Sequence, residues 1–179
     1  MSVLITILLV IAALIVLLLI IALFTKKSYT IERTITINKP VNEVFGYVRL
    51  LKNQDYFNKW VMVDPDKKKS YRGVDGTPGF VYAWNGNKQS GEGEQELTNI
   101  IEGQKVESEV RFIRPMTGVA KTFFNTEALA PNQTRVNWGM SSSMKYPMNI
   151  MLVLMSLEKM LGKDLEISMA TLKNNLEKS

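Results

Sequence analysis

Few residue types in this chain could do acid–base chemistry. Among them, three glutamates stand in one row. Glu92, Glu94 and Glu96 occupy every second position of a stretch that alternates like a strand. Carboxylates this close together inside a cavity could raise one another's pKa and act as acid and base, or bind a cation through their oxygens. On alternation alone we favour an exposed polar face. Which face looks inward stays open.

The sequence contains neither histidine nor cysteine. This removes the commonest general base near neutral pH, the thiol nucleophile, the disulfide and the commonest metal ligands. The glycine-rich stretch from Gly86 to Gly93 lacks the spacing and the strand-to-helix context of a phosphate-binding loop. We therefore assign no catalytic residue, no metal site and no cofactor.

Basic residues are in mild excess, with a net charge of +5 that is spread along the chain. This does not indicate nucleic acid and is compatible with an anionic membrane surface. The run 67–69 of three lysines is typical of a solvated strand edge that could touch lipid headgroups. Arg111 and Arg135 are expected to pair with Glu109 or Glu107 across strands. Arg33 shares a face with apolar residues, and we expect it in water at the strand end rather than near a pocket.

Alternation and turn signals predict the elements that must position these residues. A strand is expected from Tyr29 to Ile37, and Pro40 then starts a short helix over residues 41–48. A second short helix follows at about 50–57. About six further strands form an antiparallel meander, at residues 67–74, 80–84, 90–101, 106–113, 119–130 and 134–143.

The last third of the chain predicts one long helix from Pro147 to Glu177. Its apolar residues recur at three- and four-residue steps and form one stripe, while Met148, Met151 and Met155 form a second row beside it. A helix with so long an apolar side needs a broad apolar surface to pack against. The fold class is therefore α+β, a curved antiparallel sheet wrapped around a long C-terminal helix. The stripe consists of Ile150, Leu154, Leu157, Leu161, Leu165, Met169, Leu172 and Leu176.

Residues 3–24 contain no charged side chain and are long enough, at about 1.5 Å per residue, to cross a bilayer. No basic residue precedes this run and no A-x-A pattern closes it, so we favour a retained anchor over a cleaved signal peptide. Lys26 and Lys27 follow, which places the domain in the cytoplasm by the positive-inside rule. We expect a single-pass membrane protein with an anchor at 1–27 and one domain at 28–179.

Three segments carry a resemblance to a known superfamily. The stretch ITINKPVNEVFGYV followed by Trp60, the segment YAWNGNKQSGEGEQEL and the segment TRVNWGM resemble the SRPBCC superfamily, which includes polyketide cyclase-like and StAR-related lipid-transfer domains. The resemblance covers roughly residues 28 to 178. It implies a helix-grip fold with an apolar cavity between sheet and C-terminal helix, where different members hold lipids, sterols, polyketides, quinones or hormones. The N-terminal anchor lies outside the superfamily core.

A set of aromatic and methionine residues would line such a cavity, or would simply be core. We predict a membrane-tethered domain that binds a lipid-like or other apolar small molecule. The alternatives are a cyclase, dehydratase or hydrolase that uses a cavity carboxylate, and a protein-interaction module. The expected partners are the apolar ligand and the membrane through residues 3–24, with no nucleic acid and no assigned protein partner. The predicted ligand-binding residues are Trp60, Tyr82, Trp84, Phe112, Trp138 and Met140, with Trp60 closing one end, and Met148, Met151 and Met155 facing the sheet from the helix.

Overall fold

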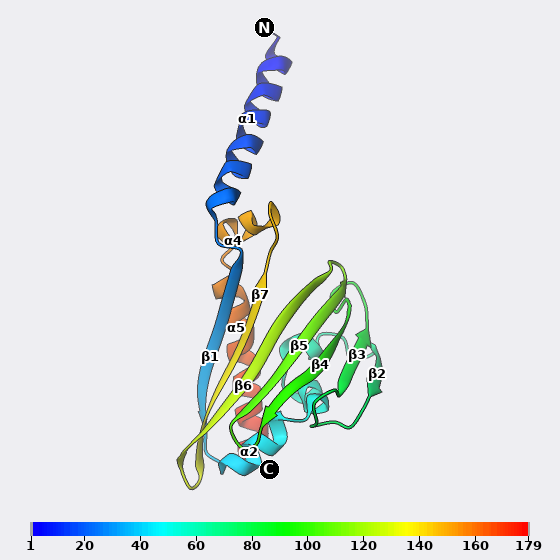
Figure 1. Ribbon diagram of the computed structural model, residues 1–179, viewed down its shortest axis with the longest axis vertical. Coiled ribbons are helices and arrows are strands. Elements are labelled where there is room, and N and C mark those ends of the chain that lie inside the picture. Colours follow the sequence, from blue (N-terminus) through cyan, green and yellow to red (C-terminus); the bar gives the residue numbers. More distant parts are fainter. Residues whose placement is uncertain (1, 179) are drawn as a thin grey trace.

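Alternating apolar residues build a seven-stranded sheet in the computed structural model, which describes residues 2–178 (Figure 1). The strand order is β1-β7-β6-β5-β4-β3-β2, and every neighbouring pair is antiparallel. The seven predicted strands and the α+β helix-grip class are confirmed. The strands are β1 (Ser28–Ile37), β2 (Lys68–Arg72), β3 (Val81–Asn85), β4 (Glu92–Ile101), β5 (Lys105–Arg114), β6 (Gly118–Ala130) and β7 (Gln133–Ser143).

Three short helices connect β1 to β2. They are α2 (Val41–Val48), the 3-10 helix η1 (Leu51–Tyr56) and α3 (Lys59–Met62). The first two match the predicted helices, and α3 was not predicted. Helix α2 buries its apolar side in the main core because Val44, Phe45 and Val48 are all nearly inaccessible to solvent.

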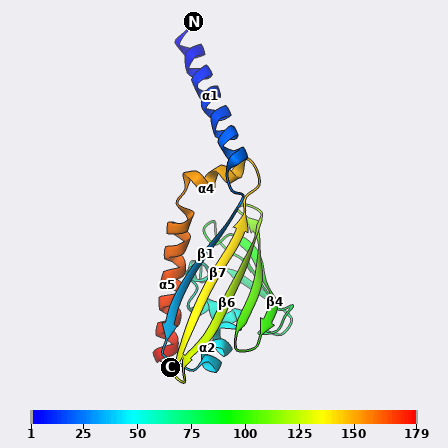
Figure 2. The ribbon, with the colours of Figure 1, turned by 60° about the vertical axis from the view of Figure 1, so that its left-hand side comes forward.

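The C-terminal helix α5 (Leu157–Lys178) lies against the concave side of the sheet, next to β1 (Figure 2). Its second half fills the core through Leu165, Met169, Leu172 and Leu176, each at most 3% exposed. This part of the predicted apolar stripe is confirmed. Burial of such side chains contributes roughly 1.5–3 kcal/mol each.

The predicted start of this helix at Pro147 was wrong. Residues 147–156 instead hold a 3-10 turn η2 (Met148–Ile150) and a single-turn helix α4 (Met151–Leu154). Met155 then takes an extended conformation, with φ −109° and ψ 135°, and ends the helix. The continuous helix therefore begins only at Leu157, and α4 runs in a different direction from α5 (Figure 2).

Arg33 joins β1 to α5, which corrects the expectation that it lies in water. Its Nη2 and Nε atoms form ion pairs with Glu158 at 2.8 Å and Glu166 at 2.6 Å, one helical turn to either side of Gly162. A Cβ at Gly162 would lie only 1.9 Å from Arg33 Nη2. Glycine at this position lets the guanidinium lie directly against the helix backbone, and any larger side chain would displace it.

Helix α1 (Val3–Phe24) projects from the end of the sheet where β1 begins and β7 ends (Figure 1). Within residues 2–178, it is the one helix long and apolar enough to cross a membrane, and it would equally pass as a signal sequence. All residues of α1 are exposed except Ala22, which is buried. Thr25, the residue after the helix, is half-buried.

The Arg33–Gly162 contact predicts a strongly non-additive pair of substitutions. In the Arg33→Ala background, Gly162→Ala should raise the free energy of unfolding by about 1 kcal/mol, because alanine is the better helix former. With Arg33 present, the new methyl group displaces the guanidinium from its two glutamates, and that gain should vanish or reverse. Unfolding in guanidinium chloride, followed by tryptophan fluorescence, gives the free energy of unfolding of all four combinations. Equal effects of Gly162→Ala in both backgrounds would show that the contact does not matter.

Candidate functional site

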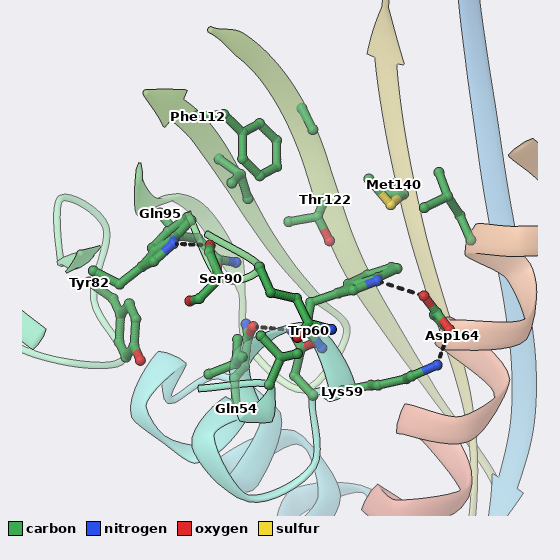
Figure 3. Close-up of a pocket in the computed structure, with 18 of the residues that line it drawn as sticks. Gln54, Lys59, Trp60, Tyr82, Ser90, Gln95, Phe112, Thr122, Met140 and Asp164 are labelled. Carbon is green, nitrogen blue, oxygen red and sulfur yellow. Dashed lines mark hydrogen bonds and ion pairs between the residues drawn. The ribbon is translucent and has the colours of Figure 1, made fainter. Parts of the chain in front are cut away.

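A cavity of about 550 Å³ lies between the concave face of the sheet, the segment of residues 54–67 and the first half of α5 (Figure 3). It occupies the half of the grip nearer α1, because the first residues of β1 and the turn between β5 and β6 both line it. The second half of α5 fills the opposite half with core side chains. The space between the sheet and α5 is therefore filled by side chains at one end and contains the cavity at the other.

The sheet wall of the cavity is aromatic. Trp84, Gly93 and Phe112 lie side by side on β3, β4 and β5 in the strand register. A Cβ at Gly93 would lie 2.7 Å from the Trp84 ring, so the missing side chain makes room for the indole. The Trp84 and Phe112 rings then meet edge to face, with centroids 6.4 Å apart. Trp138 and Met140 on β7 continue this wall toward α5.

The opposite wall is held to α5 by Asp164. The Trp60 indole Nε1 donates a hydrogen bond of 3.0 Å to Asp164 Oδ2, and the Lys59 ammonium forms an ion pair with the other carboxylate oxygen (Figure 3). The Lys59 backbone N–H also donates to Ser168 Oγ at 3.0 Å. Trp60 packs edge to face against Trp138, with centroids 6.1 Å apart. Trp60 therefore bridges the helix and the sheet at one end of the cavity.

Four polar side chains line the cavity although each is at most 8% exposed. They are Gln54, Asn58, Lys67 and Gln95. Asn58 Nδ2 donates to Gln54 Oε1 at 2.8 Å, and Gln95 Nε2 donates to Ser108 Oγ at 2.8 Å. Buried polar groups with defined partners fix the orientation of a ligand in an otherwise apolar pocket.

Lys67 is the unexpected member of this group. The run 67–69 was predicted to be a solvated edge, but Lys67 is only 7% exposed and its ammonium donates to the Val61 carbonyl. Burial lowers the pKa of Lys67. Tyr82 on β3 also lines the cavity, and burial and a 2.8 Å hydrogen bond from its Oη to Asp55 raise its pKa.

Six of the nine predicted ligand-binding residues line the cavity. They are Trp60, Tyr82, Trp84, Phe112, Trp138 and Met140. The three methionines do not: Met148, Met151 and Met155 lie in the segment before α5, near the end of α1. Their expected place opposite the sheet depended on a single long helix, which does not exist. Whether any of these residues binds a ligand stays a prediction.

The glutamate row lies on the outer face of the sheet. Gly93, Gln95 and Leu97 are buried, while the glutamates between them point outward. Arg111 binds Glu96, Glu94 and Glu109 at 2.6, 2.8 and 2.9 Å, and these hydrogen bonds raise its pKa. Arg114 holds Glu92 in the same way, and Arg135 pairs with Glu127 instead of with the β5 glutamates. Residues 2–178 contain no group of three or more carboxylates that could hold a metal ion.

The lowered pKa of Lys67 predicts a specific pH dependence. Between its folded pKa and the ordinary lysine value of 10.5, the unfolded chain binds more protons than the folded one, so this residue makes stability rise with pH. Lys67→Met should remove that rise and leave the variant relatively more stable at neutral pH. The measurement is the free energy of unfolding of both proteins from pH 7 to 10. Lys68→Met, which removes a charge from an exposed position, is the control and should keep the wild-type slope.

No protein-family model and no curated protein matches this sequence. The structure, in contrast, is similar to many solved ones. The di-domain ARO/CYC StfQ from the steffimycin biosynthetic pathway superimposes with a TM-score of 0.60 at 9% identity, over 85% of this chain and 51% of that chain. Protein CV1439 from Chromobacterium violaceum gives 0.58 at 10% identity, over 83% of this chain and 96% of that chain.

Ara h 8.0201 gives a TM-score of 0.57 at 11% identity, over 85% of this chain and 99% of that chain. Identities this low establish the fold and nothing beyond it. The part of the chain that follows α1 therefore has the helix-grip fold that the sequence resemblance implied.

Proposed function

We propose that this protein is a membrane-tethered binding domain for a lipid-like or other apolar small molecule. The observation that supports this most strongly is the cavity of about 550 Å³ whose sheet wall consists of Trp84, Phe112, Trp138 and Met140. Pockets for small apolar ligands have this size and character, with a few polar groups among aromatic and aliphatic side chains. A ligand that buries roughly 300 Å² of apolar surface there gains about 7 kcal/mol before the costs of ordering.

The polar wall narrows the ligand class to a molecule with one polar end. Gln54, Asn58 and Lys67 come from one segment and face the aromatic sheet across the cavity. The Lys67 ammonium has three donors, of which the Val61 carbonyl accepts one. A carboxylate or carbonyl oxygen on an otherwise apolar ligand would suit this wall. Fatty acids and similar amphiphiles fit that description.

The tether is supported by the way α1 joins the domain. Ala22 at its end is fully buried, and its carbonyl accepts a 2.7 Å hydrogen bond from Asn149 Nδ2. Cleavage after α1 would remove that acceptor from a buried side-chain amide, which is costly. A retained helix that crosses the bilayer keeps the cavity within reach of molecules dissolved in the membrane.

The enzyme alternative would need a cavity carboxylate that is available to a substrate. The name of one solved neighbour, the di-domain ARO/CYC StfQ, raises this alternative. The carboxylate that lines the cavity in the described residues, Asp164, is already bound by Lys59 and Trp60. The glutamate row is outside. Binding is therefore the function that this site supports best.

Tryptophan fluorescence tests the proposal directly, since all three tryptophans of the chain line the cavity. A brominated fatty acid added to the full chain in detergent should quench their emission saturably, because bromine quenches at contact. Ala120→Phe places a ring in the cavity from a buried position on β6 and should weaken binding at least about tenfold, or 1.4 kcal/mol.

The matched control is Ala128→Phe, which adds the same ring at an exposed position of the same strand. It should bind like the wild type. Quenching that does not saturate, or that is equal in Ala120→Phe and Ala128→Phe, would mean that the fatty acid does not enter the cavity.

A further inference from the structure

The segment that follows β7 fixes the end of α1. Asn149 is fully buried, and its Nδ2 donates to the carbonyls of Ala22 at 2.7 Å and Thr25 at 3.2 Å. The last carbonyls of a helix have no partner within the helix, so these bonds act as a cap supplied from a distant part of the chain. Met144 N–H also donates to the Lys27 carbonyl at 2.8 Å. Helix α1 and the segment after β7 are therefore joined at a defined position.

The same segment exposes a dense set of apolar side chains. Residues 146–155 contain no charge, and their one amide side chain, Asn149, is turned inward to the α1 cap. Exposed apolar patches of this kind mark surfaces that contact a protein partner, a membrane or a ligand. The exposed members are Val153 and Leu154 at 60%, Met148 at 52%, Tyr146 at 43% and Met155 at 38%.

The position of this segment favours a membrane as the surface that it contacts. Helix α4 lies at the level where α1 ends and β1 begins in both views, and in Figure 2 it extends sideways above α5 (Figures 1 and 2). A helix of 22 residues spans about 33 Å, close to the thickness of a bilayer core. If α1 crosses the membrane, α4 lies where α1 leaves it. Exposed lysines flank this level at Lys26, Lys27 and Lys145, where they can meet anionic headgroups.

We propose that residues 146–155 lie in the headgroup–acyl boundary of the membrane that α1 spans, as a second point of attachment. The inference rests on the tether proposed above and adds the surface and the partner to it. Two attachments joined by Asn149 fix the orientation of the domain, where a single helix on a flexible linker would leave it free. The apolar side chains that were predicted to face the cavity thus face lipid.

This orientation has a consequence for the cavity. A groove of about 630 Å³ lies between the first residues of β1 and the segment from Leu152 to Lys159. Tyr29 lines both this groove and the ligand cavity. With residues 146–155 in the lipid boundary, the groove lies at the membrane surface. Tyr29 would then lie between the membrane surface and the ligand cavity.

Site-specific quenching tests the proposal on the full chain. The sequence has no cysteine, so a single introduced cysteine carries a fluorescent label at one known place. Leu154→Cys, Leu14→Cys in the middle of α1 and Leu129→Cys at the far end of β6 replace leucines that are 60%, 55% and 39% exposed. The labelled proteins are placed in nanodiscs of phosphatidylcholine and phosphatidylglycerol, with nitroxide on the acyl chains of some lipids.

We expect the nitroxide to quench the labels at 154 and 14 at least about threefold more strongly than the label at 129. Quenching at 14 with none at 154 would leave the tether intact and overturn the interfacial segment. A label at 154 that is shielded from water but not quenched would mean that a protein surface covers the segment, which also overturns the proposal. Absence of quenching at 14 as well would refute the tether itself.

Discussion

The cavity exists because the first half of α5 is held away from the middle of the sheet. On one side Arg33 of β1 reaches under Gly162 and binds glutamates on both flanking turns. On the other side Asp164 holds Trp60 and Lys59 of α3. The helix thus rests on two supports with a space between them, and only its second half descends into the core. Without these two supports, the helix would gain apolar contacts by collapsing onto the aromatic wall.

The polar residues of the site follow from the same arrangement. The chain between α2 and β2 connects the contact with α5 to the strand at the edge of the sheet, and on the way it passes along the cavity. Its backbone and side chains must find partners there, which explains the bonds between Asn58 and Gln54 and between Lys67 and the Val61 carbonyl. A mostly apolar cavity therefore acquires one polar wall. At the end of the sheet nearest α1, Asn149 joins the segment after β7 to that helix, so that the cavity, the groove and α1 have fixed relative positions.

Much of this fold is predictable from local pattern. Strict alternation in β1 and β4 predicted both strands and favoured an exposed face for the β4 glutamates. The structure confirms that these glutamates are outside, because Gln95 and Leu97 are inside. The break before α5 was missed because apolar spacing continues across it, although Ser156 followed by Glu158 is a helix-start signal that was available. The break itself serves a distant contact, the burial of Asn149 against α1, which no local pattern records.

The site was predictable in its aromatic part and not in its polar part. Trp84, Trp138 and Met140 lie on the apolar faces of predicted strands, so their direction followed from alternation. Lys67 and Arg33 were misplaced because a charged residue is normally solvated. Their positions depend on tertiary partners, the Val61 carbonyl for Lys67 and the α5 glutamates for Arg33.

Native mass spectrometry of the full chain, extracted from cell membranes without added ligand, shows whether the cavity holds a small molecule. We expect a population heavier than the bare chain by one small apolar molecule, which lipid extraction and fragmentation then identify. A bare chain in every preparation, under conditions gentle enough to keep membrane lipids on other proteins, would contradict the claim that this cavity holds a ligand.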